Sequence, residues 1–280
     1  MCNQENLKGH LGMNRFGASY FSGCPIPLED FLKLCHEIGL DYVEIQAEHP
    51  YSPSEIDTRK IDYLKDLLSS YGLTPLLHGP VHDVNLASTK ERIRSASVDI
   101  TKDCIVLADA LGSRDMVIHA GKCPADQVPL MLDRARECAI KSISELAPFA
   151  NDLGIGIGLE NKQKSKDREV IMKVDEHVSM VTEFQHLGVF AVLDLGHAFT
   201  TGCNLVEYVH AVRNILREVH VHDNNGQYDD HLALGRGDLP LEEVVLALHD
   251  IRFNGPMILE VKDIAELGTS LQLLIELSHT

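Results

Sequence analysis

The chain lacks several features that mark particular classes of protein. It contains no tryptophan, no Cys-x-x-Cys pair and no apolar run near the ~20 residues that a membrane-spanning helix needs. Its first twelve residues, MCNQENLKGHLG, hold no apolar core of the kind found in secretory signals. The seven cysteines are an odd number and are widely scattered. We therefore expect reduced thiols in a cytoplasmic protein, not a membrane protein or a disulfide-stabilised secreted one.

Basic residues are also scarce. Lys and Arg number 25 against 42 Asp and Glu, which gives a formal net charge of -17. A surface of that charge repels nucleic acid and anionic membranes unless a local basic groove offsets it. The composition therefore favours a small-molecule substrate over nucleic acid or a membrane, and it leaves open whether the protein forms a homo-oligomer.

Short apolar or β-branched runs alternate eight times with longer stretches of helical periodicity. The predicted strands cover residues 15–21, 42–46, 74–78, 115–119, 155–160, 189–194, 218–222 and 257–261. The predicted helices cover residues 27–38, 57–71, 88–112, 125–153, 167–187 and 205–215, and two more begin at 240 and 263. Ser88 and Glu91 have the spacing of a capping box for the third helix.

Continuous apolar strands without a flexible linker favour one parallel sheet that is buried on both faces. We predict an α/β fold, a single (β/α)8 TIM barrel over residues 13–280, preceded by a polar N-terminal extension of residues 1–12. In this fold the active site lies at the C-terminal rim of the strands.

Carboxylates and imidazoles gather where these strands are predicted to end. Because all strands of a parallel barrel end at one rim, side chains there lie close together. Oxygen and nitrogen ligands at this density suit a divalent metal, namely Mn, Mg, Co or Zn, rather than a thiolate zinc site. The candidate ligands are His78, His119, Glu160, Asp194, His197, His220, His222, Asp229, His231 and Glu260.

Each candidate has a simpler explanation when it is considered alone. A lone histidine at a strand end, such as His78 or His119, is more often a hydrogen-bonded histidine than a ligand. Glu160 closes a buried strand, where a carboxylate must be paired, protonated or bound to a metal. Glu260 poses the same problem, although Lys262 offers it an ion-pair partner. The common rim makes the whole set a stronger signal than any one member.

The motifs around these residues resemble those of the xylose isomerase-like TIM barrel superfamily, which holds sugar isomerases and epimerases together with endonuclease IV-like apurinic endonucleases. The motifs are HGPVHDVNLAS, VIHAG, GLEN, LDLGHAF, HVHDNNGQYDDHLALGRGD and ILEVK. In the sugar enzymes four side chains hold one divalent metal, and the matching residues are Glu160, Asp194, His220 and Glu260. The nuclease branch adds two further metals, and its extra ligands match His78, His119, His197, Asp229 and His231. The resemblance thus implies one to three ions per chain.

The resemblance implies a divalent-metal-dependent isomerase or epimerase of a small sugar or sugar phosphate, acting through an enediolate. Glu160 and Glu260 would transfer the proton, and His197 would orient or protonate a substrate oxygen. The predicted substrate contacts are His222, Arg236 and Lys262. Arg236 either binds a substrate phosphate or carboxylate or pairs with Asp238.

Two other functions stay open. A multi-zinc phosphodiesterase acting at abasic sites in DNA would use the full ligand set. However, the loop AEHPYSPSE is acidic, and Val81 and His82 stand where the nuclease branch carries bulky residues. A sugar-binding sensor without catalysis is the third possibility, but both proton-handling glutamates favour an enzyme.

Overall fold

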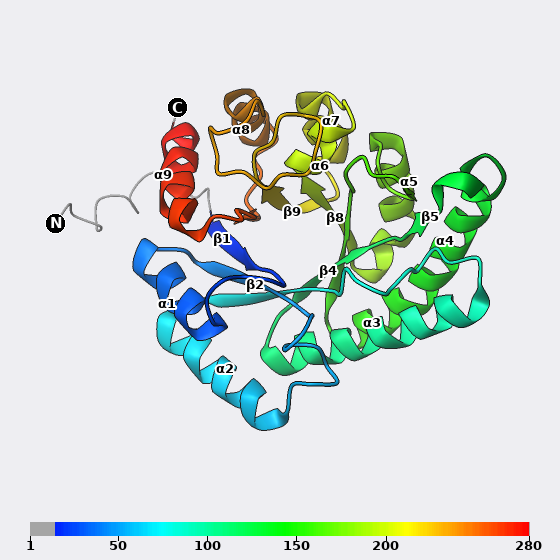
Figure 1. The fold of residues 1–280 in the computed structure, drawn as a ribbon, viewed down its shortest axis with the longest axis horizontal. Helices are drawn as coiled ribbons and strands as arrows, with labels where there is room; N and C mark the ends of the chain where they lie inside the picture. The colour runs from blue at the N-terminus through cyan, green and yellow to red at the C-terminus, as the bar shows by residue number, and fades with distance from the viewer. Residues whose placement is uncertain (1–14, 280) are drawn as a thin grey trace.

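Eight parallel strands close into a barrel in the computed structural model, which describes residues 15–279. The strands are β1 (Arg15–Tyr20), β2 (Tyr42–Gln46), β3 (Thr74–His78), β4 (Asp115–His119), β6 (Gly156–Glu160), β8 (Val189–Asp194), β9 (Leu216–Val221) and β10 (Pro256–Leu259). The first and last strands pair, with Arg15 opposite Pro256 and Ala18 opposite Leu259. The predicted (β/α)8 barrel is confirmed (Figure 1). The expected extension, residues 1–12, lies outside the described residues.

Helices connect consecutive strands and surround the barrel (Figure 1). They are α1 (Leu28–Ile38), α2 (Thr58–Tyr71), α3 (Glu91–Leu111), α4 (Val128–Asp152), α5 (Val174–Phe184), α7 (Leu205–Val212), α8 (Leu241–Asp250) and α9 (Leu267–Ser278). Local sequence sets their limits: Asp57 caps α2 by accepting a hydrogen bond from the N–H of Lys60 at 2.8 Å, and Gly72 ends it at a φ of 66°. Within residues 15–279, none of the helices has both the length and the hydropathy to traverse a bilayer.

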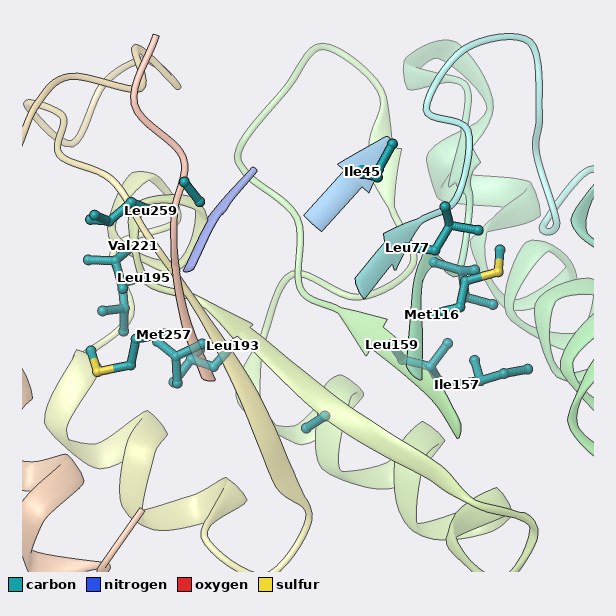
Figure 2. Packing of buried hydrophobic residues seen from close by; sticks show 14 of the residues in the cluster. Ile45, Leu77, Met116, Ile157, Leu159, Leu193, Leu195, Val221, Met257 and Leu259 are labelled. Atoms are coloured by element: carbon teal, nitrogen blue, oxygen red, sulfur yellow. The ribbon is translucent and has the colours of Figure 1, made fainter. Parts of the chain in front are cut away.

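The outward face of the strands forms the main hydrophobic core with the helices (Figure 2). Side chains alternate between the two faces of a strand, so every second residue points toward this layer. Leu159, Leu193 and Val221 are members of this core, and each is 0% exposed. Because the outward residues supply the packing, the inward residues of the same strands are available for chemistry.

The inward face carries a separate, smaller hydrophobic cluster of Val117, Phe190 and Val192. Gly158 makes room for it, because a Cβ at this position would lie 2.5 Å from Val192 Cγ2 and 2.9 Å from the Phe190 ring. Gly156 is equally close to Phe190, at 3.0 Å. Two of the three glycines that alternate with isoleucine in the GIGIG segment, Gly156 and Gly158, therefore make room for bulky side chains of the neighbouring strand β8.

One predicted helix begins later than its periodicity indicates. Residues 167–173 precede α5, and within them β7 (Arg168–Glu169) pairs antiparallel with β5 (Lys122–Cys123). The N–H of Val170 donates to the carbonyl of Gly121 at 2.9 Å, which continues this pairing. The backbone of this segment is thus bonded to a distant loop, which a local helical pattern does not reveal.

Two further local differences concern helix starts. The short helix α6 (Leu195–Thr200) follows β8 directly, in the interval between the predicted strand 189–194 and the predicted helix 205–215. Asp194 caps it, because its side chain accepts a hydrogen bond from the N–H of His197 at 2.6 Å. The predicted capping box at α3 was wrong: Ser88 Oγ accepts from the N–H of Lys90 at 3.3 Å, and Lys90 is the cap residue.

Candidate metal centre

A cavity of about 470 Å³ opens at the carboxyl ends of the strands. The predicted residues that line it are His78, His119, Glu160, His197, Asp229, His231, Glu260 and Lys262. Three more predicted residues, Asp194, His220 and His222, contact these and are 0% exposed. His78 and Glu260 are 182 positions apart in the sequence, and both line this cavity at the rim of the barrel.

The central group consists of Glu160, Asp194, His220 and Glu260. His220 Nδ1 lies 3.4 Å from one oxygen of Glu160 and 3.4 Å from one oxygen of Glu260. Ligand atoms of Glu160, Asp194 and His220 lie within 4.8 Å of one another. Among the described residues, Asp194 Oδ2 and His220 Nδ1 have no hydrogen-bond partner. Buried polar atoms are nearly always bonded, so the donor set of this group fits a divalent cation.

Two flanking groups adjoin the central group. The first consists of His78, His119 and Glu160, and the second consists of His197, His222, Asp229 and His231. In the first, His119 Nε2 lies 2.7 Å and His78 Nε2 3.6 Å from Glu160 Oε2. In the second, Asp229 Oδ2 lies 3.3 Å from both His197 Nε2 and His231 Nε2. By geometry His222 belongs to this second group of possible cation ligands. The resemblance implied a substrate contact at this position instead.

Backbone carbonyls fix the rings of three histidines in these groups. Nδ1 lies 2.7 Å from a carbonyl oxygen in His78, 3.0 Å in His197 and 2.9 Å in His231. A carbonyl only accepts hydrogen bonds, so Nδ1 carries the hydrogen in each ring. Nε2 then faces the carboxylates and is the nitrogen available to a metal in the neutral ring.

The buried charges shift one another's pKa. Burial raises the pKa of Glu160, but Lys162 and the neighbouring imidazoles outweigh burial and hold this pKa well below its usual value. Burial lowers the pKa of His197, but the Asp194, Asp229 and Glu160 carboxylates together outweigh burial and raise this pKa well above its usual value. For His119, burial and then Lys162 lower the pKa to about 3. The Glu160 carboxylate is thus anionic, and a bound cation would have to displace the proton of an imidazole such as His197.

Lys162 is a member of the site that the sequence analysis missed. Its ammonium lies 3.4 Å from Glu160 Oε2 and 3.4 Å from His197 Nε2, and its side chain lines the cavity. Burial lowers its pKa, but Glu160 and the other nearby carboxylates outweigh burial and raise it. The signal was present in GLENK, where alternation puts a residue two positions after Glu160 on the same face.

A buried aspartate holds the loop that carries Asp229 and His231. The Asp223 carboxylate accepts hydrogen bonds of 2.9–3.1 Å from the backbone N–H groups of Asn224, Gly235, Gly237 and Leu239. His231 has a φ of 50°, in the left-handed region that side-chain-bearing residues rarely adopt. Such a conformation costs on the order of 1 kcal/mol and persists only where the surroundings impose it.

Two predicted contacts differ from what the structure shows. Arg236 lies outside the residues that line the cavity and donates to Glu266 Oε1 from Nε at 3.0 Å and from Nη2 at 2.6 Å. Its acidic partner is therefore Glu266, not Asp238. Lys262 lines the cavity, but the Glu260 carboxylate faces imidazoles, with His231 Nδ1 at 3.7 Å from Oε2.

Residues 32–277 match the family described as xylose isomerase-like TIM barrel. The chain belongs to this family. An uncharacterized protein of Methanocaldococcus jannaschii is 33% identical over 271 residues, 94% of this chain and 88% of the relative. A D-psicose 3-epimerase of Agrobacterium fabrum is 26% identical over 262 residues, 89% of this chain and 84% of the relative. A probable endonuclease 4 of Staphylococcus epidermidis is 24% identical over 227 residues, 75% and 74% of the two chains.

A solved structure agrees with this assignment. A D-tagatose 3-epimerase-like protein aligns with a TM-score of 0.85 at 29% identity, over 95% of this chain and 97% of that chain. Members of the xylose isomerase-like family that resemble this chain thus include proteins named as epimerases and one named as a nuclease.

Proposed function

We propose that the protein is a divalent-metal-dependent epimerase or isomerase of a small sugar. The observation that carries this proposal is the position of two glutamates from different strands. Glu160 and Glu260 each place an oxygen 3.4 Å from His220 Nδ1, at the floor of one cavity. The relatives named as a D-psicose 3-epimerase and a D-tagatose 3-epimerase-like protein support a sugar isomerase or epimerase at the level of the family.

The central group would hold the cation through Glu160, Asp194, His220 and Glu260. Such an ion, when bound, draws electron density from adjacent carbonyl and hydroxyl oxygens of an open-chain sugar. Glu160 and Glu260 would approach the sugar from opposite faces. One would remove the proton beside the carbonyl, and the other would return a proton, which changes the configuration or moves the carbonyl.

His197 and Lys162 would bind substrate oxygens. His197 is 2% exposed and borders both the central group and the second flanking group, so it would orient or protonate an oxygen. The Lys162 ammonium would donate a hydrogen bond to an oxygen that becomes negative as the proton leaves. A cavity of about 470 Å³ is of the size that small-molecule sites usually have.

The test is proton exchange in deuterated water, with a panel of ketoses, aldoses and their phosphates and with Mn, Co or Mg. The wild-type protein should incorporate deuterium at the carbon beside the carbonyl. Glu260→Gln should lose ~10²–10⁴-fold in turnover, because it removes one proton-transfer group. Glu37→Gln, on helix α1 and 57% exposed, is the matched control and should leave turnover unchanged. Turnover that survives Glu260→Gln unchanged would overturn the proposal.

The second candidate is a multi-zinc phosphodiesterase acting at abasic sites in DNA. The two flanking groups favour it, because clustered metals can stabilise the attacking and leaving oxygens of a phosphodiester. The net charge of -17 disfavours DNA as a partner. Metal analysis of the purified protein separates the two candidates. About one ion per chain is expected for the epimerase, and about three zinc ions are expected for the phosphodiesterase.

A sugar-binding sensor without catalysis is the third candidate. It predicts a sugar-dependent rise in melting temperature without deuterium exchange in the same panel. The cytoplasmic location and the homo-oligomer stay predictions from the sequence.

A further inference from the structure

Two buried glutamates lie inside the barrel and were not among the predicted ligands. Glu44 in β2 is 0% exposed and Glu218 in β9 is 1% exposed. Neither lines the cavity. Strands β2 and β9 are not neighbours in the barrel, so the two side chains approach one another across its interior. A buried carboxylate is costly unless a partner compensates it.

Both carboxylates face His220, which hydrogen-bonds Glu218 and lies within ion-pair distance of Glu44, whose two oxygens have no hydrogen-bond partner among the described residues. Its Nε2 lies 3.2 Å from Glu218 Oε1 and 3.5 Å from Glu44 Oε2. Its Nδ1 faces the other way, toward Glu160 and Glu260. The imidazole thus lies between an inner pair of carboxylates, Glu44 and Glu218, and the outer ones of the central group. Among residues 15–279, Glu44 has no ion pair other than the one with His220.

His220 differs from the histidines whose rings are fixed by the backbone. In His78, His197 and His231 a carbonyl oxygen receives the hydrogen of Nδ1 and leaves Nε2 for the site. In the described chain no backbone carbonyl accepts a hydrogen bond from the His220 ring. The ring is also turned the other way, so that Nδ1 and not Nε2 faces the site. Glu44 and Glu218 therefore occupy, relative to the His220 ring, the position that a backbone carbonyl occupies relative to the other three rings.

We propose that Glu44 and Glu218 are positioning residues that accept the hydrogen of His220 Nε2 and so hold Nδ1, unprotonated, toward the central group. The inference rests on the proposed cation site. It states that two residues behind His220 fix the orientation of this ligand. A carboxylate behind a ligand imidazole fixes the tautomer and the ring orientation, and it makes the ligand nitrogen more basic. Two carboxylates from separate strands hold the ring from two directions.

The first experiment measures Co(II) binding, by competition with a chelator and by the d–d absorption of the ion, which reports ligand geometry. Glu44→Leu and Glu218→Leu remove the acceptors, and they should weaken Co(II) binding by ~10–100-fold and change the spectrum. Glu44→Gln and Glu218→Gln keep an acceptor oxygen and should restore much of the affinity. Glu37→Leu, on the exposed face of α1, is the control and should match the wild type.

The outcomes separate this inference from the proposed function. If the wild type binds Co(II) and the leucine variants bind it with the same affinity and spectrum, the inference is overturned and the cation site stands. If the leucine variants only melt at a lower temperature, with Co(II) binding unchanged, the glutamates are structural and the inference is again overturned. If the wild type binds no divalent cation, the proposed function falls together with the inference.

A second experiment needs no substitution in the inner pair. In the Zn(II)-loaded, ¹⁵N-labelled wild-type protein, long-range ¹H–¹⁵N spectra show which ring nitrogen carries the hydrogen. His220 is assigned from the signal that disappears in His220→Asn. The expected pattern is a hydrogen on Nε2 and a metal-shifted Nδ1. A hydrogen on Nδ1 would overturn the inference even if the leucine variants failed to fold.

Discussion

The outer and inner faces of the same barrel strands differ in almost every property. On the outer face, Leu159 and Leu193 pack under the helices (Figure 2). One residue further along each strand, Glu160 and Asp194 face inward and are 1% and 0% exposed. The two residues of each pair are equally buried, but the outward side chain is aliphatic and the inward one is charged. The two-residue period of a strand thus separates the residues that stabilise the fold from those that can perform chemistry.

Two buried histidines show the same contrast. His177 lies on the outer side, where Nε2 is 2.8 Å from the Leu159 carbonyl and Nδ1 is 3.0 Å from the Tyr208 hydroxyl. Burial lowers the pKa of His177 to about 4. His197, on the inner side, is also buried, yet the neighbouring carboxylates, Asp194 foremost, together outweigh burial and raise its pKa. The charge of the partners, and not burial alone, decides whether a buried histidine is neutral.

The largest expected effect is the loss of sugar turnover when a residue of the inner face is replaced. Glu160→Gln should lower sugar turnover by ~10²–10⁴-fold, because it removes a proton-transfer group and a cation ligand together. The free energy of unfolding of the metal-free protein should fall as well, by ~3–5 kcal/mol, because the variant leaves the buried Lys162 ammonium and the His197 imidazole without their anionic partner. Steady-state kinetics and urea unfolding measure the two quantities. A variant that keeps turnover but loses stability would reverse the assignment of the two faces.

The neighbouring outer residue should affect stability without affecting the cation site. Leu159→Ala leaves a cavity in a fully buried position and should lower the free energy of unfolding by ~2–5 kcal/mol. The affinity for Co(II) in the folded protein should stay within about twofold of the wild type. Urea unfolding and chelator competition measure these. A large loss of cation affinity with little loss of stability would contradict the comparison.

The pH dependence of stability should carry the signature of His177. Its folded pKa of about 4 lies below the value of about 6.5 expected in the unfolded chain. As the pH falls below about 6.5, the unfolded state therefore binds a proton that the folded state does not bind. The free energy of unfolding then drops by up to ~1.4 kcal/mol per pH unit until about pH 4. Above about pH 6.5 this group has no effect on stability.

His177→Gln isolates this contribution. The difference in unfolding free energy between the wild type and His177→Gln should be constant above about pH 6.5 and should change steadily below it. Urea unfolding from pH 7.5 to 4.5 measures the difference. A difference that is independent of pH over this range would show that His177 is not a neutral buried group.

A smaller effect is expected where the inner face is tightly packed. Gly158→Ala would place a Cβ 2.5 Å from Val192 Cγ2, and the shift this forces should lower stability by ~1–3 kcal/mol. Gly268→Ala in helix α9 is the control, because its Cβ would lie 3.9 Å from Ile38 and alanine favours a helix. Thermal unfolding compares them. Equal stability of the two variants would show that the strand relaxes at Gly158.

The smallest effect is expected at the surface. Arg236→Gln breaks an ion pair with Glu266 in which the arginine side chain is 66% exposed, and exposed pairs contribute little to stability. Because Arg236 does not line the cavity, KM for a sugar or a sugar phosphate should also stay the same. A selective rise in KM for phosphorylated substrates would place Arg236 at the substrate after all.

The barrel and most of the rim residues were predictable, because strand ends in a (β/α)8 fold point to one place. The histidine and carboxylate positions followed from that rule alone. Glu44 did not, because a glutamate in YVEIQ looks like the polar side of an ordinary strand until the barrel closes around it. Strand β7 depends on pairing with residues distant in sequence, so a local pattern did not reveal it.

The pairing of β1 with β10 means that the two ends of the chain must meet before the site exists. Glu260 follows the last strand, whereas His78 and His119 end strands from the first half of the chain. A nascent chain that has not yet released its last strand can build most of the helical layer but cannot assemble the ligands. Cation binding would then report that the last strand has joined the barrel. Two separately expressed half-barrels would regain cation binding only if they associated with each other.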